Sequence, residues 1–381
     1  MSRPLPVTLV GGFLGAGKTS FLHHIISEHQ GGHLAVLVEN PGPLNLDAKA
    51  IRGLCGAMRR TNDTVLEIPN DGDEDQLAWI ASRLKEFSLA GRHERVLIEV
   101  AGTTNPARLA EHFLPQRDGL FAEFAWLEQV ICLVDALDYF RGITGPVAAQ
   151  AWLPFQNEQI ASASLVILNK CDLLDEKSRD RCLDALHKLR PGLRVAETAY
   201  GEVPAELWST PATTIDLAAN VETSLKPGAE GTATPDLASA LYRVHRPFHP
   251  QRFWDWFNAD HPGLLRVKGL IWLASRNLLV GGVSRTRWQN GCGTAGIWWA
   301  ALPREEWPED PAALQRMQEY WREPYGDRRQ ELVLIGEAGP LSSAMRRELD
   351  ACLLTDEEYS RPVIEWSTFP DPFPEWDVAG D

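Results

Sequence analysis

The fold of this 381-residue chain is decided by the stretch Gly12-Phe13-Leu14-Gly15-Ala16-Gly17-Lys18-Thr19. It matches the pattern G-x-x-x-x-G-K-[ST], follows the apolar run Val7–Val10 and opens a helical stretch over Ser20–Ile26. Glycines let such a loop wrap closely around phosphate, with backbone N–H groups and the helix N-terminus directed at the anion. The stretch therefore predicts a P-loop, and a glycine-rich turn matched by chance is the less favoured interpretation.

The residues of this loop have distinct expected roles. Lys18 is expected to reach the β- and γ-phosphates of a nucleoside triphosphate and to act in catalysis, and the Thr19 hydroxyl is expected to bind Mg²⁺. Catalysis of phosphoryl transfer is mainly positional and electrostatic, so the charges of Lys18 and Mg²⁺ would carry most of it. The other residues expected to bind the nucleotide here are Gly12, Gly15, Ala16, Gly17 and Ser20.

A second motif, Asn169-Lys170-Cys171-Asp172, closes the apolar run Leu165–Leu168. An aspartate at the end of a strand can accept hydrogen bonds from guanine N1–H and its exocyclic amine, while Asn169 braces the loop. Adenine presents an acceptor where guanine presents a donor, so it would leave the carboxylate unpaired. Alone this is a weak turn signal, but downstream of a P-loop it predicts guanine binding by Asn169, Lys170 and Asp172.

A third motif, Glu99-Val100-Ala101-Gly102, ends another apolar run. A carboxylate at Glu99 could hold Mg²⁺ through a water molecule, and the N–H of Gly102 could contact the γ-phosphate. Alone, an acidic residue at a strand end is more often a solvated cap than a ligand. Together with the other two motifs, it predicts that Glu99 and Gly102 belong to the catalytic site.

Apolar runs without alternation recur along the first half of the chain, separated by helix-length segments. The runs are Val7–Val10, Leu34–Val38, Val96–Val100, Val130–Val134 and Leu165–Leu168. This arrangement is typical of parallel strands buried on both faces. Residues 1–215 are therefore predicted to form an α/β domain with a doubly wound, mostly parallel sheet of the P-loop GTPase type, whose ligands lie at the carboxyl ends of the strands.

The second half of the chain has a different composition. Residues 216–238 contain few large apolar residues and are predicted to be a linker. Leu265–Leu273 alternates like a half-buried strand, and Leu341–Leu353 is an amphipathic helical pattern. Residues 239–360 are therefore predicted to form a smaller α+β domain, and residues 361–381, rich in proline, acidic and aromatic residues, an extended tail.

Composition excludes several classes of partner. The formal net charge of −15 argues against a general nucleic-acid or anionic-membrane surface, because both need a basic footprint. No apolar stretch approaches the ~20 residues that a transmembrane helix needs. The six cysteines are scattered, with no pair at C-x-x-C spacing, which argues against a disulfide framework and favours a reducing compartment. We expect a cytoplasmic protein with no nucleic-acid or membrane partner.

The three motifs, in this order, resemble those of the CobW-like GTPases, which are implicated in metal delivery and metalloenzyme maturation. The P-loop of that family typically reads G-F-L-G-A-G-K-T, its E-x-x-G matches Glu99–Gly102, and the segment that closes over the base is similar to Ala199–Val203. Further matches lie in the second domain, at Pro247–Phe253, Arg266–Gly269, Gly326–Leu332 and Leu349–Thr355. The 239–360 region is therefore similar to the CobW-type C-terminal domain.

The resemblance implies GTP and Mg²⁺ as cofactors, hydrolysis of GTP to GDP and phosphate as a conformational switch, and a client protein as partner in a metallochaperone-type or maturation role. GTP and Mg²⁺ would order the segment Asn40–Asp47, and hydrolysis would release it. No residue stands out as an in-chain arginine finger, so slow turnover without a partner is expected. The identity of the client, any metal involved and the oligomeric state stay open.

The chain departs from that family where relatives carry an N-G-C-x-C-C segment whose thiolates bind zinc or a similar ion. The equivalent stretch, Glu67–Leu77, contains no cysteine, and the switch segment N-E-F-G is altered to Glu39-Asn40-Pro41-Gly42. Soft divalent ions prefer thiolate or imidazole ligands, so no transition-metal site is predicted. The acidic run Asp71–Asp75 could be a hard-cation site, but a turn followed by an acidic first helical turn is the favoured interpretation.

Two other functions compete with a GTPase switch. One is a GTP-dependent scaffold that binds nucleotide and partner without moving a metal, which the missing cysteines favour. The other is a small-molecule phosphotransferase, which is the weaker alternative because a kinase does not need the guanine-selecting Asp172.

Overall fold

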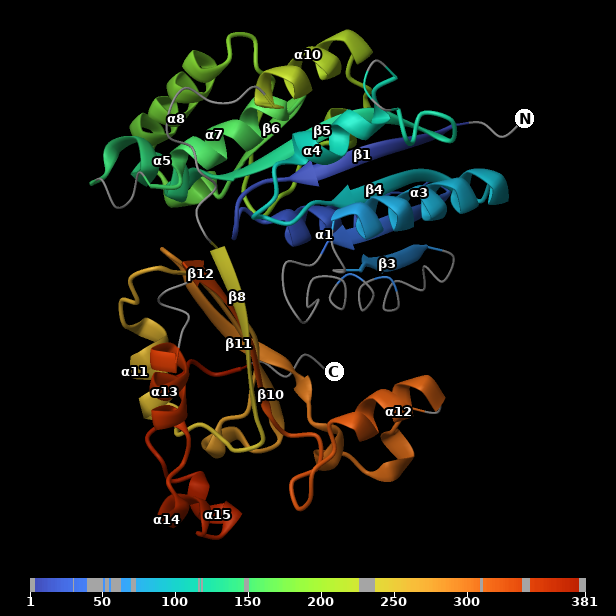
Figure 1. Cartoon of the computed structure of the whole chain (residues 1–381). Coiled ribbons are helices and arrows are strands. Elements are labelled where there is room, and N and C mark those ends of the chain that lie inside the picture. The colour runs from blue at the N-terminus through green and yellow to red at the C-terminus, as the bar shows by residue number, and fades with distance from the viewer. Residues whose placement is uncertain are drawn as a thin grey trace. The chain divides into compact units, whose positions relative to one another are not determined.

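The computed structural model describes residues 4–29, 31–39, 51, 55, 63–69, 73–115, 117, 119–146, 151–225, 237–308, 311–337 and 343–376. These residues divide into two compact units, the first ending at residue 225 and the second beginning at residue 237 (Figure 1). The predicted switch segment Asn40–Asp47, the turn Asn70–Gly72, and residues 226–236 and 377–381 lie outside the described residues.

The first unit is built on a seven-stranded parallel sheet with strand order β3-β2-β4-β1-β5-β6-β7. Its strands are β1 Leu5–Gly11, β2 His33–Glu39, β3 Thr64–Ile68, β4 His93–Glu99, β5 Ala125–Asp135, β6 Leu165–Asn169 and β7 Val195–Glu197. Every predicted apolar run lies in one of these strands or ends one residue beyond it. The predicted doubly wound α/β sheet is confirmed.

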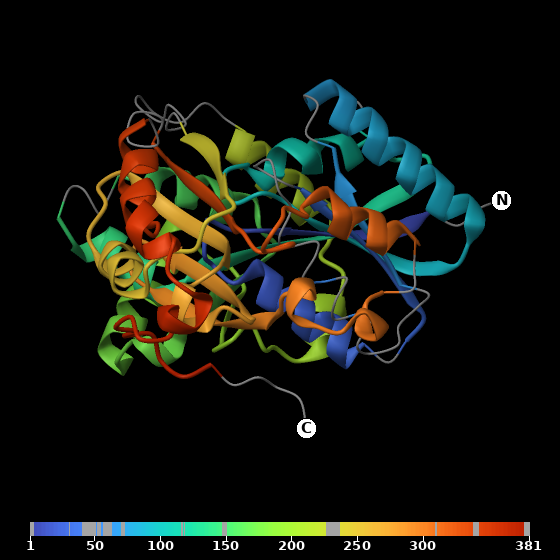
Figure 2. The ribbon, with the colours of Figure 1, turned by 90° about the horizontal axis from the view of Figure 1, so that it is seen from below.

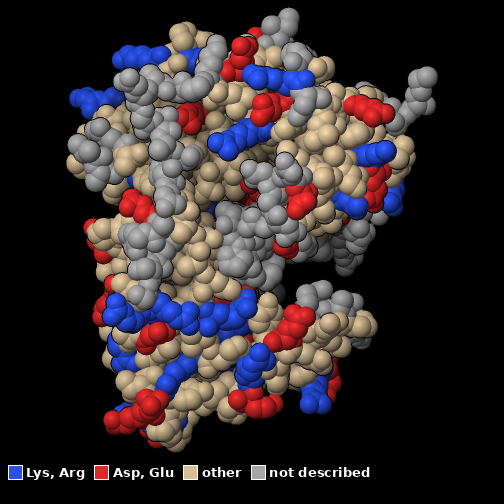
Figure 3. Space-filling view, in the orientation of Figure 1, with Lys and Arg blue, Asp and Glu red and all other residues tan. Residues whose placement is uncertain are grey.

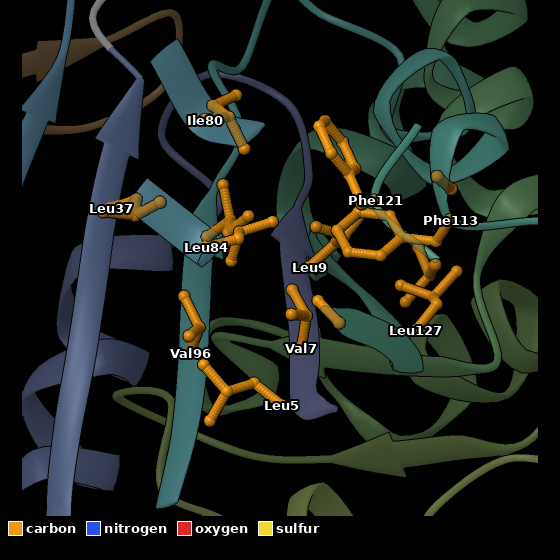
Figure 4. Close-up of a cluster of buried hydrophobic side chains, with 14 of the residues drawn as sticks. Leu5, Val7, Leu9, Leu37, Ile80, Leu84, Val96, Phe113, Phe121 and Leu127 are labelled. Atoms are coloured by element: carbon orange, nitrogen blue, oxygen red, sulfur yellow. The ribbon is translucent and has the colours of Figure 1, made fainter. Parts of the chain in front are cut away.

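Helices cover both faces of this sheet (Figure 1). They are α1 Lys18–Glu28, α3 Asp73–Ala90, α4 Pro106–Ala110, α5 Ala136–Thr144, α7 Leu153–Ser162, α8 Glu176–Leu189, α9 Ala205–Ser209 and α10 Thr214–Leu225. Successive residues of β2 point to opposite faces, so Leu37 packs with α3 and Val36 packs with α1. In the buried hydrophobic cluster between the sheet and α3, Val7 and Leu9 of β1 lie beside Leu84 of α3 (Figure 4). A sheet buried on both faces explains the continuous apolar runs.

The linker prediction is wrong for residues 216–225, because helix α10 occupies them. Leu217 and Val221, one helical turn apart, are fully buried in the core cluster that also holds β1 and α3. Few large apolar residues are present in the segment, but these two suffice to dock the helix. Helix α3 begins at Asp73, which agrees with an acidic first helical turn for that part of the run Asp71–Asp75.

The second unit is an α+β domain on a five-stranded antiparallel sheet with strand order β11-β10-β9-β12-β8. Its strands are β8 Leu237–Val244, β9 Leu264–Ile271, β10 Leu279–Thr286, β11 Asn290–Ile297 and β12 Gln330–Glu337. Its helices are α11 Pro250–Asn258, α12 Pro311–Glu319, α13 Ser343–Cys352, α14 Asp356–Tyr359 and α15 Val363–Trp366. Helices α11 and α13 lie side by side on one face of the sheet (Figures 1 and 2). The predicted strand over Leu265–Leu273 and the predicted helix over Leu341–Leu353 are both present.

Charge is distributed unevenly over the second unit. Figure 3 shows a row of Lys and Arg side chains across the face of this unit that the view presents. The net charge of −15 belongs to the whole chain and does not describe this surface.

The prediction of an extended tail is wrong for residues 361–376, which pack on the second unit. Trp366 is fully buried and Trp376 is 9% exposed. The Arg276 guanidinium holds the segment, with 2.7 and 3.0 Å bonds to the Asp371 carboxylate and a further bond to the backbone oxygen of Phe373. The Pro-rich and acidic composition suggested a tail, but the aromatic side chains of the segment pack against apolar residues of the domain.

A bidentate ion pair between helices α11 and α14 predicts acid sensitivity. Arg252 donates to both carboxylate oxygens of Glu358, at 2.9 and 2.6 Å, and hydrogen bonding to Arg252 lowers the pKa of Glu358 from 4.5 to about 2. A lowered carboxyl pKa stabilises the fold above pH 4.5, and this stabilisation is lost as the pH falls toward 2. We expect Glu358→Gln to lower the free energy of unfolding by about 2 kcal/mol at pH 7, and the difference to shrink below pH 4.5.

Urea unfolding of the wild type and of Glu358→Gln between pH 3.5 and 7 measures this difference. The control is Glu357→Gln, because Glu357 is 87% exposed and its 3.6 Å ion pair with Arg361 should contribute less than about 1 kcal/mol. A Glu358→Gln effect that stays constant across this pH range contradicts the prediction.

Candidate nucleotide-binding site

The predicted P-loop connects β1 to α1 through tightly turned backbone. Gly12, Gly15 and Gly17 have φ angles of +129°, +81° and +99°. A Cβ atom on Gly17 would lie 2.3 Å from the side-chain nitrogen of Asn169, so no larger residue fits there without displacing that side chain. The loop therefore turns back on itself directly beside the second motif.

The N-terminus of α1 is suited to an anion. The first N–H groups of a helix carry partial positive charge. At the N-cap of α1, Gly17, no side chain caps these groups, and the first turn has no acidic residue to offset their charge. Lys18 is 5% exposed, and its Nζ donates to the backbone oxygen of Gly12 at 2.8 Å. The half-buried Thr19 and the exposed Ser20 follow at the same helix end. The Lys18 ammonium and the positive end of the α1 helix dipole therefore both lie beside the loop that follows β1.

Asn169, which is 1% exposed, joins the motifs. Its amide nitrogen donates to the backbone oxygen of Ala16 in the P-loop at 2.9 Å. Its amide oxygen accepts from the backbone N–H of Lys170 and of Gly201, both at 2.9 Å. One side chain thus ties the P-loop to the second motif and to the segment Ala199–Val203, which the sequence suggested as the cover of the base.

Lys170 and Asp172, the other two residues of the second motif that are expected to bind the nucleotide, differ in exposure, because Lys170 is half-buried and Asp172 is exposed. Lys170 has φ +62°, and its Nζ donates to the Asp135 carboxylate at 2.7 Å. Asp172 lies exposed in the turn Cys171–Leu173. No role was predicted for Asp135, which also caps helix α5 by accepting from the N–H of Leu137 at 3.0 Å. Its place directly after a predicted strand and before a helix was the available signal.

The loop that follows β4 lies against the P-loop. A Cβ atom on Gly102 would be 2.8 Å from the backbone nitrogen of Leu14, so the two loops approach closely at this glycine. The Glu39 carboxylate accepts from the N–H of Ala101 at 2.9 Å and from the Thr104 hydroxyl at 3.0 Å. The sequence predicted a role for Gly102 but noted Glu39 only as part of the altered switch segment. Its contact was missed because it joins the end of β2 to the loop after β4.

The donor set at this sheet edge fits Mg²⁺, a hard cation that takes oxygen ligands. Thr19 offers a hydroxyl at the start of α1. Glu99, 4% exposed, offers a carboxylate at the end of β4, where it pairs with Val10 of the neighbouring strand β1. Glu99 therefore ends the strand next to β1, and Thr19 lies at the start of the helix that follows the P-loop after β1.

A soft-metal site has less support among the described residues. No group of three or more His, Cys, Asp or Glu side chains among them is arranged to hold a metal ion. Burial raises the pKa of the Cys132, Cys182 and Cys352 thiols to about 12, and it also raises the pKa of the Cys171 and Cys292 thiols. Zinc binds thiolates rather than thiols, and burial disfavours the thiolate form of these five cysteines. Within the described part of the chain, no helix is long and apolar enough to cross a bilayer.

A P-loop and an N-K-x-D turn at the carboxyl ends of β1 and β6, joined by Asn169, define the class of P-loop GTPases. The chain belongs to the CobW/HypB/UreG family. Residues 6–197 match the nucleotide-binding domain of CobW/HypB/UreG, and residues 237–353 match the C-terminal domain of the cobalamin synthesis protein cobW. The predictions of a GTPase and of this family are confirmed.

The chain is similar to proteins named for zinc. It is 30% identical over 405 aligned positions to the zinc-regulated GTPase metalloprotein activator 1 of Dictyostelium discoideum, covering 97% of this chain and 84% of the relative. It is 26% identical to the zinc chaperone YjiA of Escherichia coli over 53% of this chain and 59% of the relative. The crystal structure of Zn(II)-bound YjiA GTPase aligns with a TM-score of 0.39 at 19% identity, over 92% of this chain and all of that one.

Proposed function

We propose that this protein binds GTP with Mg²⁺, hydrolyses it slowly, and uses the change of nucleotide to act on a client protein. The observation that carries the proposal is the position of Asn169, whose amide bonds to Ala16 of the P-loop, to Lys170 and to Gly201. One residue thereby fixes the expected phosphate site and the expected base site relative to each other, as a single nucleotide that spans both requires.

Each predicted site residue has a chemical task in this proposal. Gly12, Gly15, Ala16 and Gly17 let backbone N–H groups surround the phosphates, and Ser20 adds a polar group at the helix end. Lys18 offsets negative charge that develops on the β- and γ-oxygens, and Gly102 presents its N–H to the γ-phosphate. Asp172 selects guanine, while Asn169 and Lys170 hold its loop. Bound Mg²⁺, held by Thr19 and through water by Glu99, would supply further charge compensation.

The client protein is inferred from the relatives. One is named a metalloprotein activator and another a zinc chaperone. We propose a metallochaperone-type or maturation role in the cytoplasm, with a scaffold that moves no metal as the alternative. The alternative is favoured by one observation, the lack of cysteine in Glu67–Leu77, where relatives of the family carry their thiolates.

Hydrogen exchange tests the switch itself. Exchange is compared between the GDP-bound protein and the protein bound to a non-hydrolysable GTP analogue. We expect protection to differ in the loop Ala101–Thr104 and in peptides of the second unit. Identical exchange in both states would overturn the proposed switch. It would not bear on GTP hydrolysis, which is measured separately.

Zinc binding separates the two proposed roles. We predict that the purified, tag-free protein binds no Zn²⁺, Co²⁺ or Ni²⁺ tighter than about micromolar, equivalent to ~8 kcal/mol, because the stretch Glu67–Leu77 lacks cysteine and the remaining cysteines are scattered along the chain. The GTPase rate should also be insensitive to these ions at saturating Mg²⁺. Titration calorimetry that finds one zinc per chain at submicromolar affinity contradicts this. Such a result would direct attention to Cys55, His33 and the run Asp71–Asp75.

A further inference from the structure

Helix α7 carries two buried glutamines one turn apart, and one of them contacts the loop after β4. The amide nitrogen of Gln159 donates to the backbone oxygens of Gly102 and Thr104, at 3.2 and 2.8 Å. Gln159 is fully buried, and its amide oxygen has no hydrogen-bond partner among the described residues. A buried amide is costly unless it is bonded, so the two bonds to the loop are the polar interactions that favour glutamine at this position.

The same helix holds the end of the loop through a second route. The Asn105 amide donates to the Ser224 hydroxyl at 3.0 Å, and Ser224 donates to the backbone oxygen of Glu158, the neighbour of Gln159, at 2.7 Å. Asn105 and Ser224 are each 8% exposed. Two consecutive residues of α7 therefore restrain the loop, Gln159 directly and Glu158 through Ser224.

Glu39 holds the loop from β2, through the N–H of Ala101 and the hydroxyl of Thr104. The carbonyl oxygens of Gly102 and Thr104 face α7, and the Ala101 N–H and Thr104 hydroxyl face Glu39. The peptide unit that carries the Gly102 N–H therefore lies between two bonded units, one held at the Ala101 N–H by Glu39 and one held at the Gly102 carbonyl by Gln159.

We propose that Gln159 is a positioning residue for GTP hydrolysis. It fixes the carbonyl side of the loop, so that the N–H of Gly102 is directed at the γ-phosphate. This inference rests on the proposed function, in which Gly102 contacts that phosphate. Because only GTP carries the γ-phosphate, the effect of Gln159 falls on GTP binding and turnover and leaves GDP binding unchanged.

Three variants test the proposal on the full chain. Gln159→Met removes both donated bonds while keeping length and volume, and Gln159→Glu places an acceptor against two carbonyl oxygens. Gln156→Met is the matched control, because Gln156 is 7% exposed on the same helix but donates to Asp138 rather than to the loop. We measure dissociation constants for GDP and for a non-hydrolysable GTP analogue, the kcat for GTP, and the urea midpoint.

For Gln159→Met we expect about a tenfold loss of the preference for the GTP analogue over GDP, equivalent to about 1.4 kcal/mol, and a similar fall in kcat. Gln159→Glu should lose more, and Gln156→Met should keep the wild-type preference even if its urea midpoint falls. Unchanged preference and kcat in Gln159→Met, with GDP binding intact, would overturn the inference. Equal losses of GDP and GTP binding in both methionine variants would also overturn it, since that pattern is a purely structural role. A wild-type protein that binds no GTP would instead overturn the proposed function.

Discussion

Replacing Lys18 by alanine should abolish measurable GTP hydrolysis, with kcat at least about a hundredfold below that of the wild type. The ammonium group lies in the P-loop, 2.8 Å from the backbone oxygen of Gly12, where its positive charge offsets charge that develops on the transferred phosphoryl group. Alanine removes that charge. Phosphate release under saturating GTP and Mg²⁺ measures the change.

A matched control is Lys188→Ala, which removes the same charge from an exposed position near the end of α8 and should leave kcat unchanged. Circular dichroism establishes that Lys18→Ala is folded, since Lys18 is 5% exposed and its loss could disturb packing. If a folded Lys18→Ala hydrolyses GTP at the wild-type rate, the assignment of the P-loop is wrong.

Asp172→Asn should weaken GTP binding by about 1–3 kcal/mol and relax discrimination against xanthosine triphosphate. The carboxylate accepts from the N1–H and the amine of guanine, and an amide in its place can offer a donor to the extra oxygen of xanthine. Competition for a fluorescent nucleotide measures both affinities.

The control for this change is Asp180→Asn, an exposed carboxylate on α8 that should leave nucleotide preference unaltered. A wild-type protein with equal affinity for ATP and GTP would remove the basis for the guanine assignment. An Asp172→Asn variant that loses GTP without gaining xanthosine triphosphate would point to a disturbed turn instead.

Local patterns allowed the parallel sheet and its motifs to be predicted. A strand, a glycine loop and a helix are contiguous in sequence, so Gly12 to Thr19 could be identified without any tertiary contact. Continuous apolar runs gave the strands, because a sheet covered on both faces buries every residue of its strands. The P-loop and the motif at Asn169 could be assigned to one nucleotide site because ligands of such a sheet lie at the carboxyl ends of its strands.

The parts that were missed depend on contacts between distant residues. Gln159 and Gly102 lie 57 positions apart, and Glu39 and Ala101 lie 62 apart, so no sequence spacing connects them. The errors at residues 216–225 and 361–376 have the same origin, because average composition conceals a few residues such as Leu217 and Trp366 that become buried. Burial depends on where the rest of the fold offers an apolar surface.

We propose that the chain is a Mg²⁺-dependent GTPase that selects guanine. Phosphate release by the purified wild type from GTP and from ATP, each with Mg²⁺ and with EDTA, tests this claim. We predict slow turnover of GTP with Mg²⁺, and release at background level from ATP and from both nucleotides in EDTA. Equal rates with GTP and ATP, or a GTP rate that survives EDTA, would contradict the claim.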